Sequence, residues 1–82
     1  MRLPRDVSGR DLVHALEAFG YFVVRQSGSH IRLSTRTQPE HSLTIPDHDS
    51  LRVGTLAGIV ADVAAHHGLS KDDVGRRLFG DR

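Results

Sequence analysis

Two β-prone segments separated by Gly28-Ser29 constrain the fold of this chain more than any other feature. Residues 21–26 are rich in aromatic and β-branched side chains, and residues 30–35 alternate between polar and apolar ones. Glycine followed by serine suits a two-residue type II′ turn, because glycine accepts the positive φ that the first turn position needs. The pattern predicts a β-hairpin whose second strand begins at His30.

Helical patterns lie on both sides of this hairpin. Three helices are expected, over residues 9–19, over residues 54–67 and from Ser70 onward. The first and the last each begin with a Ser-x-x-Asp sequence, in which the serine hydroxyl and the aspartate carboxylate cap each other's backbone amides. Gly20 and Gly68 are placed to end the first two helices in the left-handed conformation.

A third strand is predicted over residues 41–45, closed by Pro46. The expected hairpin pairs are Ser27 with His30, Arg25 with Arg32, and Val23 with Ser34. Directly paired residues share a face of the sheet. The core face is therefore expected to carry Phe22, Val24, Ile31, Leu33, Leu43 and Ile45. The opposite face is expected to carry Arg25, Ser27, His30, Arg32 and Ser34.

This order of elements predicts an α+β fold. It is a two-layer α-β-β-β-α sandwich, in which helices cover one face of a three-stranded antiparallel sheet, and a double-stranded-RNA-binding domain has the same layout. The chain has 82 residues, so one modest core and a single domain over residues 1–82 are expected. The chain has no cysteine, no apolar run of about 20 residues and no signal-peptide pattern at its start, which fits a cytoplasmic protein rather than a membrane protein.

His30 and the arginines near it suggest a chemistry. Residues 25–36 contain Arg25, Arg32 and Arg36 and no carboxylate, although the formal net charge of the chain is only +1. A histidine titrates near neutral pH, so it can take a proton from a ribose 2′-hydroxyl or give one to a leaving oxygen. Guanidinium groups hold phosphate through paired hydrogen bonds. The segment therefore points to RNA.

Several short motifs occur in order around this segment. They are Ser8-Gly9-Arg10-Asp11-Leu12, Phe19-Gly20-Tyr21, Val24-Arg25-Gln26-Ser27-Gly28-Ser29-His30, Ile45-Pro46-Asp47-His48, Gly54-Thr55-Leu56 and Gly68-Leu69-Ser70. In these motifs the chain resembles the HicA (YcfA-like) toxin family, over roughly residues 8–74.

The resemblance implies a double-stranded-RNA-binding-like fold and a toxin of a type II toxin-antitoxin system that cleaves mRNA. His30 would be the catalytic residue, Gly28 and Ser29 would present it, and a HicB-like antitoxin would cover it. The chain departs from the family at two positions where basic residues are common. Ser27 stands directly before the Gly-Ser-His motif, and Val53 stands directly before Gly-Thr-Leu.

Other side chains are candidate RNA contacts or ligands. The candidate contacts beyond the turn are Arg25, Arg32, Arg36, the loop residue His48, and Thr55 at the start of the second long helix. Tyr21 is the one aromatic residue expected near the polar face, which favours contact through the RNA backbone over base stacking. His41 is expected at the rim of the core. His66 and His67 are adjacent on a helix and do not point to one centre, so neither a metal nor another cofactor is expected.

Two functions are compatible with these residues. The first is a metal-independent endoribonuclease, in which His30 moves a proton while Arg25 and Arg32 stabilise the developing charge. The second is a non-catalytic RNA-binding or partner-binding module of the same fold. The low net charge and the missing basic residues favour the second, whereas the intact Gly-Ser-His motif favours the first.

Overall fold

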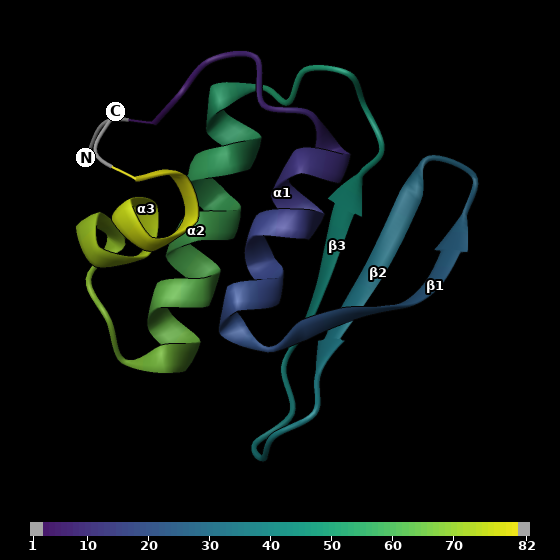
Figure 1. Ribbon diagram of the computed structural model, residues 1–82. Coiled ribbons are helices and arrows are strands. Elements are labelled where there is room, and N and C mark those ends of the chain that lie inside the picture. The colour runs from purple at the N-terminus through teal and green to yellow at the C-terminus, as the bar shows by residue number, and fades with distance from the viewer. Residues whose placement is uncertain (1–2, 81–82) are drawn as a thin grey trace.

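A computed structural model describes residues 3–80, so both ends of the domain expected over residues 1–82 lie outside the described residues. The elements follow in the order α1 (Gly9–Leu16), the 3-10 turn η1 (Glu17–Phe19), β1 (Tyr21–Ser27), β2 (His30–Thr35), β3 (Ser42–Pro46), α2 (Val53–His67) and α3 (Lys71–Phe79). The strands form one antiparallel sheet in the order β1-β2-β3. Figure 1 shows the helices as one layer against this sheet, whose other face is open. The predicted α+β architecture is confirmed.

The predicted capping residues set the helix boundaries. Ser8 Oγ accepts the backbone amide of Asp11 at 3.0 Å, and the Asp11 carboxylate accepts the backbone amide of Ser8 at 3.3 Å. Ser70 Oγ accepts the backbone amide of Asp73 at 3.1 Å and begins α3. Gly68 ends α2 with a φ of 65°, as predicted. Within residues 3–80 the helices are all too short or too polar to cross a membrane.

The core lies between the helix layer and the inner face of the sheet. All three helices and the two strands β2 and β3 contribute side chains that are almost completely buried. These side chains are Leu12, Leu16, Leu33, Ile45, Leu56, Val60, Val63 and Val74. Removing this apolar surface from water provides the main favourable contribution to folding, and it holds the two layers together.

The turn end of the hairpin has the predicted register. Ser27 pairs with His30 and Arg25 pairs with Arg32. The turn glycine has a φ of 56°, and Asp6 is the one non-glycine residue with positive φ in the described part of the chain. Ser29 therefore has a negative φ, which excludes a type I′ turn and fits the predicted type II′ turn.

Val24 interrupts the ladder farther from the turn. Val23 pairs with Leu33 and Phe22 pairs with Ser34, so Val24 forms a β-bulge with no partner of its own in the ladder. The predicted pairing of Val23 with Ser34 is therefore wrong. Leu33 faces the core and Val23 shares its face, whereas Phe22 stands with Ser34 on the open face.

Side chains at the two ends of β1 explain the bulge. In a regular strand Tyr21 and Gln26 would point to opposite faces, because they are five positions apart and successive side chains alternate between the faces. The bulge puts both on the helix side, where Tyr21 is 3% exposed and Gln26 Nε2 donates to the Asp47 carboxylate at 3.0 Å. The predictions that Phe22 and Val24 lie on the core face, and that Tyr21 lies near the polar face, are wrong for this reason.

The start of α1 contacts the end of β3 at backbone distance. The Gly9 amide donates to the carbonyl of His48 at 2.9 Å, and a Cβ added at Gly9 would lie 2.0 Å from the Pro46 carbonyl oxygen. No side chain fits in that space, so only glycine lets α1 approach β3 this closely. The contact fixes α1 against the strand end that pairs with His30.

Gly9→Ala should lower the free energy of unfolding by more than about 2 kcal/mol, because the added methyl group must push α1 away from β3. Gly58→Ala is the matched control, since Gly58 lies within α2 and a Cβ there meets nothing within 4 Å. Alanine has a better helix propensity than glycine, so Gly58→Ala should raise the free energy of unfolding by up to about 1 kcal/mol. Urea unfolding measures both values, and equal stability of the two variants would contradict the close contact.

Candidate nucleic-acid interface

Strand pairing places His30 at the turn end of the open sheet face. His30 is the first residue of β2 and is exposed, and it lies between Ser27 on β1 and Pro46 on β3. The carbonyl of Ser29 accepts the backbone amide of Asp47 at 2.7 Å, which ties the turn to the residue that follows β3. The backbone around His30 is thus held from both sides while its side chain faces solvent.

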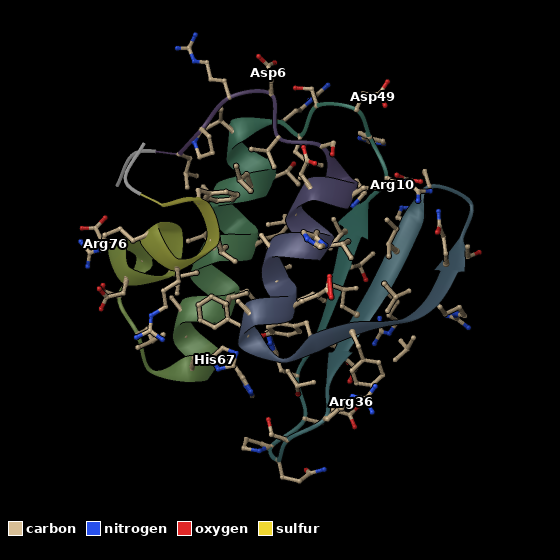
Figure 2. The ribbon with its side chains drawn as sticks, viewed as in Figure 1. Asp6, Arg10, Arg36, Asp49, His67 and Arg76 are labelled. Atoms are coloured by element: carbon tan, nitrogen blue, oxygen red, sulfur yellow. The ribbon has the colours of Figure 1, made fainter. Side chains whose placement is uncertain are left out.

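The Asp47 carboxylate anchors the loop that supports this turn. Arg10 Nε and Nη2 donate to its two oxygens at 3.2 and 3.1 Å, and Gln26 donates to the same group at 3.0 Å. A bidentate arginine–carboxylate pair has a fixed geometry. One carboxylate therefore joins α1, β1 and the loop after β3, close to the Arg10 labelled in Figure 2. The sequence predicts only a polar loop here, although Asp47 belongs to the Ile-Pro-Asp-His motif.

Two of the predicted phosphate contacts lie beside His30. Arg25 and Arg32 are cross-strand partners, and both are exposed. Residues two apart on a strand share a face, so Arg25 and Arg32 form the next open-face pair after Ser27 and His30. The two pairs are about 7 Å apart along the strands. The sequences of β1, β2 and β3 contain no Asp or Glu, so this face carries positive charge without a carboxylate from the sheet itself.

The remaining predicted contacts are more widely spread. Arg36 follows β2 at the far end of the ladder from the turn, where its guanidinium carbon lies 4.4 Å from the centroid of the Phe22 ring (Figure 2). His48 is exposed and lies two residues beyond Pro46, close to the turn. Thr55 is exposed in the first turn of α2, so it belongs to the helix layer and not to the open sheet face.

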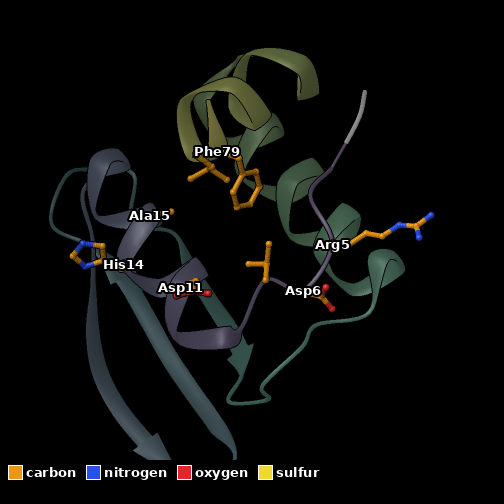
Figure 3. Close-up of a pocket in the computed structure, with 8 residues that line it drawn as sticks. Arg5, Asp6, Asp11, His14, Ala15 and Phe79 are labelled. Carbon is orange, nitrogen blue, oxygen red and sulfur yellow. The ribbon is translucent and has the colours of Figure 1, made fainter. Parts of the chain in front are cut away.

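A pocket of about 410 Å³ lies on the helix side of the molecule. It is lined by α1, by the end of α3 and by the segment that precedes α1. Figure 3 shows His14, Asp11 and Phe79 at this pocket, with the Arg5 side chain directed away from it. The pocket is therefore separate from the open face that carries His30.

Comparison with protein-family models agrees with this geometry. The model described as the HicA toxin of bacterial toxin-antitoxin systems matches residues 9–69, which include the hairpin, the loop after β3 and all of α2. The chain belongs to the HicA toxin family. Membership implies an antitoxin as partner in a toxin-antitoxin system. Searches of curated proteins and of solved structures found no match.

The HicA chain also carries a histidine cluster at the other end of the molecule, near the His67 labelled in Figure 2. The Tyr21 hydroxyl lies 2.6 Å from His41 Nδ1 and 3.2 Å from His67 Nε2. His41 Nε2 lies 3.2 Å from the Asp62 carboxylate, and the His41 ring stacks on His66 with centroids 4.3 Å apart. The predicted place of His41 at the rim of the core is confirmed, but the sequence pattern did not predict the cluster.

One set of neutral tautomers satisfies these hydrogen bonds. When His41 Nε2–H donates to Asp62, Nδ1 accepts the Tyr21 hydroxyl, whose oxygen accepts His67 Nε2–H. Burial lowers the pKa of His67, as do the neighbouring His66 and His41, and burial together with Asp62 raises the pKa of Tyr21 to about 12. The described histidines and carboxylates form no group of three or more with the geometry of a metal site. The surroundings of His67 therefore favour its neutral ring.

His67 should make the stability of the HicA chain depend on pH. Its pKa is lower in the folded chain than its ordinary value of 6.5, so below about pH 6.5 the unfolded chain binds more protons. The free energy of unfolding should have its full value above that pH and fall as the pH drops toward the folded pKa. Urea unfolding between about pH 7.5 and about pH 5 measures this fall.

His67→Gln should flatten this dependence on pH. Ala65→Gln, which places the same new side chain at an exposed position of α2 and removes no titratable group, is the control and should leave the dependence as it is in the parent chain. A fall with pH in His67→Gln equal to that of the parent would contradict the assignment to His67.

Proposed function

We propose that this HicA chain is an endoribonuclease that cleaves mRNA without a metal ion, with His30 as its catalytic residue. The observation that carries the proposal is the open sheet face. An exposed histidine stands at the turn, the exposed pair Arg25 and Arg32 occupies the next position on the same face, and the three strands contain no acidic residue. A polyanion therefore meets attractive charge on this face without repulsion from the sheet.

The reaction uses the substrate's own 2′-hydroxyl as nucleophile. The 2′-oxygen forms a bond to the adjacent phosphorus while the bond from phosphorus to the 5′-oxygen breaks. His30 either takes the proton of the 2′-hydroxyl, while water protonates the leaving 5′-oxygen, or gives a proton to the leaving 5′-oxygen, while water takes the proton of the 2′-hydroxyl. Arg25 and Arg32 hold the phosphate and stabilise the charge that grows on its oxygens. The products are a 2′,3′-cyclic phosphate and a 5′-hydroxyl.

Other residues support this site in the proposal. Gly28 and Ser29 form the turn that presents His30, and His48 offers a further RNA contact from the loop beside the turn. Arg36 extends the basic surface toward the other end of β2. Thr55 would contact only an RNA that also passes the start of α2.

The antitoxin is proposed to be HicB-like and to cover His30. The exposed side chains of Arg25, Arg32 and Arg36 offer partners for its carboxylates, and such complementary charge speeds association. RNA and antitoxin would then compete for one face of the sheet. An mRNA substrate and this restraint by a partner both suit a protein that acts in the cytoplasm.

His30→Ala should reduce cleavage of a labelled RNA at least a hundredfold, because proton transfer by a positioned histidine contributes that much or more. Its stability should change by less than about 0.5 kcal/mol, since His30 is exposed. His14→Ala is the matched control, because it removes an exposed histidine from α1 and should leave cleavage unchanged. The assay contains EDTA, and the product ends are identified by mass spectrometry.

Equal cleavage by His30→Ala and the parent chain would contradict the proposed mechanism. Loss of cleavage in EDTA that a divalent ion restores would contradict its independence of metal.

A non-catalytic RNA-binding or partner-binding module is the second candidate function. Ser27 and Val53 favour it, because the basic residues common in the family at these positions are missing here. The same assay separates the two functions. A parent chain that binds RNA but leaves it uncut would support the module.

A further inference from the structure

We propose that Phe22 and Arg36 form a stacking platform that holds one unpaired base of the RNA. This proposal rests on the proposed function, because RNA is the ligand in both. It adds a contact to a base, whereas His30, Arg25 and Arg32 act on the ribose and the phosphate.

Phe22 is the one aromatic side chain on the open face. The chain contains three phenylalanines, one tyrosine and no tryptophan, and all four aromatic residues lie within residues 3–80. Tyr21 is buried in the core, Phe19 packs on His67 with ring centroids 5.3 Å apart, and Phe79 lines the pocket beside α1. The bulge in β1 directs Phe22 outward, so an aromatic ring stands on the face that carries His30, Arg25 and Arg32.

Arg36 covers this ring with a flat cationic group. Its guanidinium carbon lies 4.4 Å from the ring centroid, which is within the range of a cation–π contact. Phe22 is half-buried and Arg36 is exposed, so the ring supports the guanidinium while Arg36 stays accessible to a ligand. Aromatic rings and guanidinium planes are the surfaces on which proteins stack unpaired RNA bases. The pair therefore has the chemistry of a base platform.

The platform lies in line with the other RNA groups of the open face. Along β2 this face carries His30, then Arg32, then Ser34 with Phe22 opposite. At about 3.3 Å per residue, Ser34 lies about 13 Å from His30 along the strand. Figure 2 shows Arg36 at the end of the sheet away from the hairpin turn. One RNA strand laid along the β1–β2 ladder would meet the histidine, the arginine pair and the platform in turn, so the stacked base belongs to a nucleotide beyond the cleavage site.

The experiment compares RNA with and without bases. The full chain carrying His30→Ala is titrated with a labelled adenosine oligoribonucleotide of about 12 residues, and with an abasic ribose-phosphate oligomer of the same length and charge. Adding Phe22→Leu should weaken binding of the adenosine oligomer roughly five- to a hundred-fold and leave binding of the abasic oligomer within about twofold. Arg36→Lys keeps the positive charge but loses the planar group, so it should also weaken binding of the adenosine oligomer more than binding of the abasic oligomer.

Phe79→Leu is the matched control, because Phe79 is likewise half-buried but lies on the helix side. It should leave both affinities unchanged, and thermal unfolding of each variant confirms that it is folded. Equal losses on both oligomers, or no loss on either, would overturn the platform and leave the proposed function standing. If the His30→Ala chain binds neither oligomer, RNA binding and the platform are overturned together.

Discussion

The backbone contact between Gly9 and the end of β3 is the constraint on which the rest of the structure depends. It brings Arg10 within reach of the Asp47 carboxylate, and the backbone amide of Asp47 in turn binds the Ser29 carbonyl. Through these contacts the helix layer sets the position of the turn that presents His30. Packing between the two layers therefore holds the candidate site, which needs no pocket of its own.

The β-bulge at Val24 determines what each face of the sheet offers. It sends Tyr21 and Gln26 to the helix side, where one fills the core and the other binds Asp47. It also leaves Phe22 on the open face, beneath Arg36. A single irregularity in β1 thus provides a core residue, an anchor for the loop after β3 and an aromatic ring on the surface proposed to bind RNA.

Local signals were enough to predict the elements and the register nearest the turn. A capping box begins the first helix, the Ser70 hydroxyl caps the last one, and a two-residue turn fixes the pairs closest to it. The bulge could not be predicted, because Phe22 and Val24 read locally as core residues. Tyr21 and Gln26 both point to the helix side because their hydrogen-bond partners lie there. These partners are on either side of β3 and at the end of α2, far along the chain. The histidine cluster escaped prediction for the same reason, since only tertiary structure brings its members together.

The central claim is that the open sheet face binds RNA, and the salt dependence of binding tests it most directly. RNA affinity of the His30→Ala chain is measured against salt concentration with Arg25→Ala or Arg32→Ala added. We expect each to weaken binding and to reduce the slope of log K against log salt by about 0.7, the contribution of one phosphate contact on a single strand. Arg77→Ala, on the exposed side of α3, should change neither quantity. An unchanged slope in both sheet variants, or a reduced slope in Arg77→Ala, would contradict the claim.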